Sequence, residues 1–253
     1  MKDVRQLAVG PLDETPIPPG PVPQLAVVIP TLHEAKNIKA VLERIRGSLD
    51  PLDINYELIV IDDDSRDGTE SIVKHVAQQD TRVRLLLRQN QRGLAGAIAH
   101  GWRHSQAEVL GVIDADLQHP PEVLPELWKT MQAGHDLVIA SRYAAPGGMR
   151  EWNLIRRLLS KISTRLAWPF QRPGIRVKDP LSGFFLVRRS SLDGISLQPE
   201  GFKILLEILV KGRIRSVAEV PFVFGLRQAG SSKADLSTGW HYLRLLERLW
   251  REP

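Results

Sequence analysis

The sequence alternates regularly between short apolar runs and longer amphipathic stretches from residue 25 to residue 140. Runs of mostly apolar residues predict buried strands at residues 25–30, 56–61, 83–87, 109–113 and 136–140. Between the runs, apolar residues recur at helical spacing, as in Ile38, Val41, Leu42, Ile45 and Leu49. This alternation predicts an α/β domain with a mostly parallel, doubly wound sheet that is flanked by helices.

The pattern changes on both sides of this region. Residues 1–24 hold six prolines and little periodicity, which predicts a Pro-rich, extended and mobile leader. After Tyr143 the pattern predicts a basic helix with its apolar stripe at Leu154, Leu158, Ile162 and Leu166, strands at 183–187 and 214–223, and a helix at 202–210. Residues 236–253 predict an amphipathic C-terminal tail, so we expect the main domain to span residues 25–235.

Composition narrows the class of protein. The 253 residues include no cysteine, which excludes disulfides and thiolate metal sites, and the histidines are scattered. No run approaches the roughly 18 apolar residues of a spanning helix, and the N-terminus lacks the apolar core of a signal peptide. Ten basic residues between residues 150 and 190 face only Glu151 and Asp179, a local excess of eight positive charges. This excess favours an anionic partner, such as a phosphate or a membrane surface, although a solvated helix face would also explain it.

Polar segments follow four of the predicted strands. They are PTLHEAKN, IDDDSRDGT, DADLQHPP and SRY, after the first, second, fourth and fifth strands. Ligands of open α/β sheets bind at the carboxyl ends of the strands, so we expect the functional site at this edge.

Two of these segments are rich in carboxylates. Asp114 and Asp116 close a buried strand, where charges must be solvated, paired or bound to a cation. Oxygen ligands suit Mg²⁺, and Gln118 continues the same spacing, although one acid capping the next helix is the alternative. In the run from Asp62 to Asp64, one acid is expected to accept hydrogen bonds from a base or ribose. Helix capping by the neighbouring Asp67 or Thr69, with a turn at Gly68, is the other interpretation.

Together with DPLSGFF, GFKILLEILVKG and EVPFVFGLRQAGSSK, these segments resemble the family-2 glycosyltransferases, most closely the dolichol- or polyprenol-phosphate mannosyltransferase branch. The resemblance runs in order from residue 25 to residue 233. It implies a single A-type nucleotide-sugar glycosyltransferase domain with a Rossmann-like sheet. It also implies inverting transfer of mannose from GDP-mannose to a polyprenyl or dolichyl phosphate, with Mg²⁺ or Mn²⁺. Sibling enzymes that use UDP-glucose or a UDP-N-acetylhexosamine stay open as alternatives.

The resemblance further implies roles for individual residues. The metal ligands would be Asp114, Asp116 and Gln118. The nucleotide and its sugar would be contacted by Pro30, Leu32, Glu34, Ile61, Asp63, Ala115 and Arg142, and the phosphates by Arg227 and Lys233. The catalytic group would be Asp116, Arg142, Arg156 and Ser160, with the last two at the acceptor phosphate. Leu32 and His33 replace the Tyr and Asn that are frequent in the family, so we expect only backbone contacts there.

An isoprenoid acceptor implies a membrane surface, and we expect a peripheral protein on its cytoplasmic face. Two candidate docking helices are residues 152–168 and residues 240–250, the latter with Tyr242, Leu243, Leu246 and Leu249 beside Arg244 and Arg248. Packing of both stripes on the sheet or on another subunit is the alternative, and a membrane-embedded partner subunit is possible. A nucleic-acid partner is not expected because interleaved aromatic residues and a recognised binding motif are lacking, although a basic nucleic-acid-binding α/β protein is a distant alternative. A catalytically silent nucleotide-sugar sensor is disfavoured by the intact acids.

Overall fold

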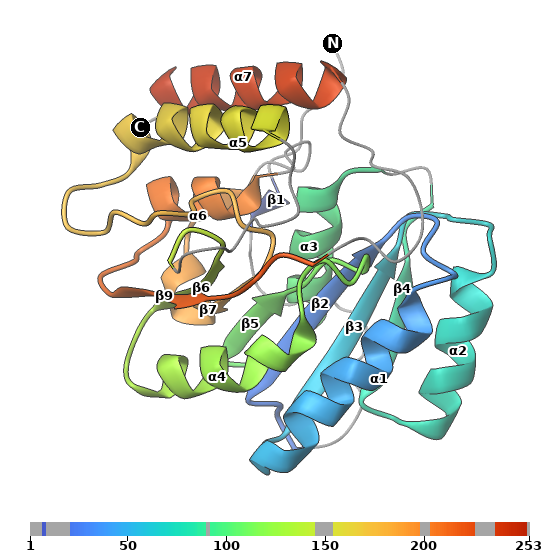
Figure 1. Cartoon of the computed structure of the whole chain (residues 1–253). Helices are drawn as coiled ribbons and strands as arrows, with labels where there is room; N and C mark the ends of the chain where they lie inside the picture. Colours follow the sequence, from blue (N-terminus) through green and yellow to red (C-terminus); the bar gives the residue numbers. More distant parts are fainter. Residues whose placement is uncertain are drawn as a thin grey trace.

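The computed structural model describes residues 7–8, 21–89, 92–144, 154–197, 203–225 and 236–251. A seven-stranded sheet consists of β2 (Leu25–Thr31), β3 (Tyr56–Asp62), β4 (Val83–Leu87), β5 (Val109–Val112), β6 (Leu137–Ser141), β7 (Phe185–Arg188) and β9 (Val217–Pro221). The strand order is β4-β3-β2-β5-β7-β6-β9 (Figure 1). Every pairing is parallel except those of β7, which runs antiparallel to both β5 and β6. The expected mostly parallel α/β sheet is therefore confirmed.

Helices cover both faces of this sheet. They are α1 (Ile38–Leu49), α2 (Thr69–Gln79), α3 (Leu94–Arg103), α4 (Leu124–Gln132) and α6 (Ile204–Lys211). The helices α5 (Leu154–Ala167) and α7 (Leu236–Arg251) form a further layer that packs on α6. Short 3₁₀ helices lie at Asp50–Leu52, Pro121–Val123, Trp168–Phe170 and Arg189–Leu192. Two short strands outside the main sheet, β1 (Leu7–Ala8) and β8 (Ser196–Leu197), pair antiparallel. The segment predicted as a mobile leader therefore contributes a strand to the fold.

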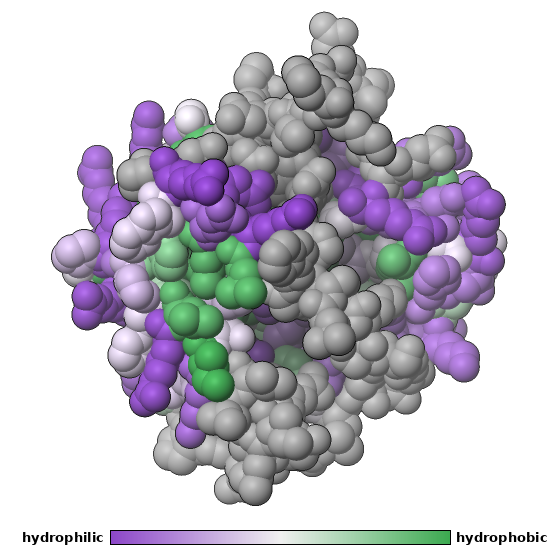
Figure 2. Space-filling model, turned by 90° about the horizontal axis from the view of Figure 1, so that it is seen from above, coloured by the Kyte–Doolittle hydropathy of each residue, from purple (hydrophilic) through white to green (hydrophobic). Residues whose placement is uncertain are grey.

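The helices α5 and α7 lie side by side (Figure 1), and the Tyr242 hydroxyl of α7 donates to the Ser163 carbonyl of α5 at 2.5 Å. Tyr242, Leu245, Leu246 and Leu249 are buried in a cluster that also contains Leu206 of α6. The expectation that Tyr242, Leu246 and Leu249 form a docking face is therefore wrong, because this stripe packs on the domain. Figure 2 looks down on the face of these two helices and shows hydrophobic side chains gathered beside strongly hydrophilic ones.

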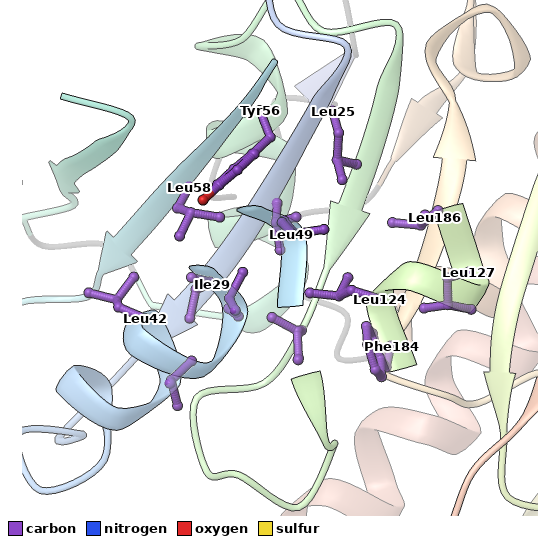
Figure 3. Close-up of a cluster of buried hydrophobic side chains, with 14 of the residues drawn as sticks. Leu25, Ile29, Leu42, Leu49, Tyr56, Leu58, Leu124, Leu127, Phe184 and Leu186 are labelled. Atoms are coloured by element: carbon purple, nitrogen blue, oxygen red, sulfur yellow. The ribbon is translucent and has the colours of Figure 1, made fainter. Parts of the chain in front are cut away.

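Successive side chains of a strand point to opposite faces of the sheet, and helices pack on both faces. The sheet therefore has a buried core on each side. Leu25, Val27 and Ile29 of β2 belong to a core with the apolar stripes of α1, α2 and α4, and Figure 3 shows the centre of this core. Ala26 and Val28 belong to a second core with α3 and α6. All five apolar stripe residues of α1 are fully buried. Each fully buried aliphatic side chain contributes about 1.5–3 kcal/mol, which holds this helix against β2 and β3.

Candidate active site

The carboxyl ends of the parallel strands meet at one edge of the sheet, where the polar segments lie. Because β7 is antiparallel, the segment that precedes it lies at this same edge. In that segment, the Ser182 hydroxyl donates to the Ala140 carbonyl near the end of β6, at 2.8 Å. The segment after β9 also returns here, since the Gly225 N–H donates to the Gln118 carbonyl at 2.9 Å. Three segments distant in sequence, DADLQHPP, DPLSGFF and EVPFVFG, therefore surround one place.

The segment after β5 carries the candidate metal ligands. Asp116 is buried and accepts the Gln118 N–H at 3.1 Å, whereas the side chain of Asp114 is one-third exposed. Between Asp116 and Gln118, Leu117 has a φ of 61°, a left-handed conformation that bulky residues rarely adopt. Such strained backbone is frequent at functional sites, and here it produces the tight turn that precedes Gln118. The Gln118 amide also donates to the Gly225 carbonyl at 3.3 Å.

The donor set fits a hard divalent cation that shares its ligands with a substrate. The described part of the chain contains no group of three or more histidine, cysteine, aspartate or glutamate side chains placed to hold a metal ion. Two carboxylates and one amide, all at the end of β5, are oxygen donors of the kind that Mg²⁺ combines with substrate phosphates. A Cβ atom on Gly183 would lie 2.8 Å from Oδ2 of Asp114, so the glycine leaves room for this carboxylate.

Asp63 lies at the end of β3 and is engaged in an ion pair. Its two carboxylate oxygens accept Nε and a terminal nitrogen of Arg88 at 2.7 and 2.8 Å, and both side chains are buried. The Gly93 N–H donates to the same carboxylate at 3.1 Å. Arg88 was not foreseen from the sequence, and its two hydrogen bonds fix the orientation of the Asp63 carboxylate. Asp67 accepts the Thr69 N–H at 3.0 Å just before α2, whose N-cap residue is Gly68 and not Asp67 or Thr69.

The other residues that were expected to contact the nucleotide differ in how far their side chains are exposed to solvent. Pro30 and Ile61 pair across β2 and β3, but the Ile61 side chain is fully buried in the core, so only its backbone can face a ligand. Leu32 is partly exposed, and Glu34 accepts the side-chain amide of Asn37 at 2.9 Å. Ala115 is buried between the two candidate metal ligands.

Arg142, directly after β6, is held by Asp179. Its Nε and one terminal nitrogen donate to the two carboxylate oxygens at 2.8 and 2.6 Å, and its backbone N–H donates at 3.0 Å. Burial opposes the positive charge of Arg142, but the hydrogen bonds and charge of Asp179 outweigh it and raise the pKa of the guanidinium. Arg142 therefore stays charged in a buried position, with its plane fixed by Asp179.

The residues that were expected at the acceptor phosphate are described only in part. The Ser160 hydroxyl of α5 lies 2.7 Å from the Tyr143 hydroxyl, so the SRY segment brings Ser160 to the edge of the site. Arg156 also lies in α5, but its side chain is outside the described part of the chain, as are Arg227 and Lys233 entirely. The structure therefore places Asp114, Asp116, Gln118 and Arg142 at one edge of the sheet, with Ser160 beside Tyr143.

Lys203, before α6, is a further site cation that was not foreseen. Burial, reinforced by the charge of Arg142, lowers the pKa of Lys203 to about 8, while Asp114 and Asp179 oppose the shift. Its ammonium donates to the Leu181 carbonyl at 3.4 Å. The sequence could have pointed to Lys203, because it is a charged residue within the largely apolar segment GFKILLEILVKG.

Comparisons with known sequences give a matching family and named relatives. The model of the family described as "Glycosyl transferase family 2" matches residues 26–195 of this chain. A relative named dolichol-phosphate mannosyltransferase from Pyrococcus furiosus is 41% identical over 90% of this chain and 64% of its own length. One of the same name from Mycosarcoma maydis is 35% identical over 90% of this chain and 80% of its own. The chain thus spans somewhat less than two-thirds of the archaeal relative.

Two solved structures share the fold. Glucosyl-3-phosphoglycerate synthase from Mycobacterium tuberculosis, in complex with Mn²⁺, UDP-glucose and phosphoglyceric acid, has a TM-score of 0.65 at 21% identity, over 90% of this chain and 79% of that one. The mannosyltransferase PcManGT from Pyrobaculum calidifontis, in complex with GDP-Man and Mn²⁺, has a TM-score of 0.53 at 21% identity, over 83% of this chain and 59% of that one. These likenesses confirm the expected A-type α/β fold.

Proposed function

Because this chain belongs to glycosyl transferase family 2, we propose that it transfers mannose from GDP-mannose to a polyprenyl or dolichyl phosphate with inversion. The observation that carries the proposal is the site at the sheet edge, in a chain 41% and 35% identical to relatives named dolichol-phosphate mannosyltransferase. The product is polyprenyl-phosphate mannose, and GDP leaves.

On the donor side, Asp114, Asp116 and Gln118 would hold Mg²⁺ or Mn²⁺ against the diphosphate. When bound, this cation supplies positive charge that stabilises the diphosphate as it departs. Asp63, oriented by Arg88, would accept hydrogen bonds from the guanine or the ribose. Arg142, with its plane fixed by Asp179, would contact the donor. Arg227 and Lys233, two and eight residues after Gly225 along the chain, would close over the phosphates.

On the acceptor side, chemistry requires little proton transfer. The phosphate of the lipid is already anionic near neutral pH, so one of its oxygens can attack the anomeric carbon directly. The new carbon–oxygen bond forms as the bond from that carbon to the donor diphosphate breaks, and no general base is needed. The site must instead bring two anions together, which preorganised positive groups do well. Ser160 and Arg156 would bind the acceptor phosphate, and Lys203 adds positive charge beside Arg142.

The isoprenoid tail of such an acceptor requires a membrane surface, and we propose peripheral attachment at the cytoplasmic face. No helix in the described residues is long and apolar enough to cross a membrane. On α5 and α7, Ile162 is 46% exposed, Leu243 51% and Trp250 75%. Exposed apolar residues and Trp beside the basic side chains of Arg244 and Arg248 suit an anionic interface. These residues would hold the site at the membrane surface without crossing the membrane.

One transfer assay tests the function. The purified chain is incubated with polyprenyl phosphate, Mg²⁺ or Mn²⁺, and a panel of labelled nucleotide sugars that includes GDP-mannose, UDP-glucose and UDP-N-acetylhexosamines. We expect lipid-linked mannose from GDP-mannose, which EDTA or Asp116→Ala nearly abolishes because the leaving diphosphate loses its counter-charge. Transfer from a UDP-sugar alone would replace the proposed donor. Full activity in EDTA would contradict the role of the metal.

A flotation assay tests the attachment. The protein should bind liposomes of anionic lipid at low salt and be released at high salt, because each basic residue near an anionic leaflet contributes roughly 1 kcal/mol. Replacement of Trp250 and Leu243 by serine should weaken binding, whereas serine at Val22, an exposed apolar residue outside these helices, should not. Equal binding of all variants would exclude α7 as the docking element.

A further inference from the structure

His119, the last residue of DADLQH, lies buried in an aromatic cage. Its ring centroid is 5.7 Å from that of Phe184, 5.5 Å from Phe222 and 5.2 Å from Phe224. The three phenylalanines come from DPLSGFF and EVPFVFG, and the proposed function gives none of them a role. Because all three ring contacts converge on one imidazole, the cage restricts the orientation of that imidazole.

The nitrogen Nδ1 of this imidazole faces the first acid of the candidate metal site. It lies 3.3 Å from Oδ2 of Asp114. Within the described residues, Nδ1 is one of the few buried side-chain nitrogen or oxygen atoms that make no hydrogen bond. Buried polar atoms nearly always have a partner, so an unsatisfied one beside a carboxylate indicates an interaction that is completed in another state of the site.

The Asp114 carboxylate is also confined from the opposite chain segment. Gly183 has no side chain and so leaves space for this carboxylate, because a Cβ atom at Gly183 would lie 2.8 Å from Oδ2 of Asp114. Oδ2 therefore has Nδ1 of His119 as its neighbour in one direction and the Gly183 backbone in another. The separation of 3.3 Å is slightly longer than an ordinary N–H···O hydrogen bond, which spans about 2.7–3.2 Å.

We infer that His119 is a positioning residue for the divalent cation: its Nδ1–H donates to Oδ2 of Asp114 in the cation-bound site and fixes the carboxylate there. The inference rests on the proposed function, because it presupposes the cation at Asp114 and Asp116. Groups that hydrogen-bond a metal ligand, without touching the metal, commonly affect the affinity for the metal. Their loss lowers this affinity roughly 10- to 100-fold. The phenylalanine cage thereby acquires a role, since it holds the imidazole in register with Asp114.

The test measures binding of Mn²⁺ in the presence of GDP, by the electron paramagnetic resonance signal of free Mn²⁺, and needs no turnover. His119→Phe keeps an aromatic ring in the cage but removes the donor, and we expect affinity to fall roughly 10- to 100-fold. His119→Asn places an amide nitrogen near the position of Nδ1 and should recover most of the affinity. Phe222→Leu, which alters the cage but keeps the donor, should change affinity far less than His119→Phe.

The outcomes separate the inference from the proposed function. If His119→Phe binds Mn²⁺ as the unaltered protein does, or if His119→Asn is as weak as His119→Phe, the positioning role is refuted. If His119→Phe does not fold, His119→Gln takes its place, because its longer side chain lacks a donor at the Nδ1 position. Loss of Mn²⁺ binding in Asp116→Ala with full binding in the His119 variants would overturn only the inference. Absence of Mn²⁺ binding in the unaltered protein would overturn the metal site itself.

Discussion

Replacement of Asp179 by Asn should destabilise the fold severely, because it leaves a buried guanidinium without its counter-charge. Asp179 is fully buried, and the side chain of Arg142 is only 10% exposed. The carboxylate accepts three hydrogen bonds from Arg142, at 2.6, 2.8 and 3.0 Å. Removal of one partner of a buried ion pair costs about 3–5 kcal/mol. At about 2–4 °C per kcal/mol for a chain of this size, the Tm should fall by about 6–20 °C.

The pair of Arg44 and Glu122 is a matched control. It has the same two-point geometry, with Nε and a terminal nitrogen donating at 2.8 and 2.7 Å, but its side chains are 34% and 55% exposed. Glu122→Gln should therefore cost no more than about 1 kcal/mol. Both variants are compared by urea unfolding at pH 7, together with transfer activity, which Asp179→Asn should also lower because Arg142 loses its fixed plane. If Asp179→Asn costs no more than Glu122→Gln, the buried ion pair of Arg142 and Asp179 does not stabilise the fold.

Three further predictions concern the site. Gly183→Ala should displace the Asp114 carboxylate and weaken Mn²⁺ binding on the order of tenfold, as seen by paramagnetic resonance; unchanged binding would contradict the close approach at Oδ2. Tyr143→Phe should remove the hydrogen bond to Ser160, worth about 1 kcal/mol, and raise the KM for polyprenyl phosphate roughly fivefold; an equal rise for GDP-mannose would argue against an acceptor role. Burial lowers the pKa of Lys203 to about 8, below its ordinary value of about 10.4, so the unfolded chain holds this proton more tightly. Lys203→Met should therefore stabilise the fold most below pH 8, and the gain should shrink as the pH rises towards 10; a gain that grows with pH in urea unfolding would refute this.

The elements between residues 25 and 140 could be predicted because their signals are local. The spacing of Ile38, Val41 and Leu42 marks α1, and the strand from Val83 to Leu87 is found with its expected ends. The place of β7 could not be predicted, since strand order depends on contacts between distant segments. The apolar stripe of α7 was visible too, but a stripe alone does not say whether a domain or a membrane covers it.

The candidate site was foreseen where residues follow a predicted strand, and missed where a tertiary partner decides their role. Asp114, Asp116 and Arg142 follow β5 and β6, and the rule for strand ends locates them. Arg88 and Asp179 were given no role, because an ion pair is visible only when both partners are in place. Asp179 nevertheless stands beside the apolar residues of DPLSGFF, and a charge in such surroundings is a signal that a partner must exist.

The position of β7 has a consequence for attempts to divide the chain. This strand comes late in the sequence yet lies between β5 and β6, so it joins the strands on its two sides into one sheet. A fragment that stops near residue 150 would keep β5 and β6 but lose the strand that pairs with both. Its sheet would have two open edges in the middle of the apolar core, a surface prone to aggregation. Separate expression of a nucleotide-binding half and an acceptor-binding half should therefore fail, whereas complementation should require that the second fragment insert β7 between the strands of the first.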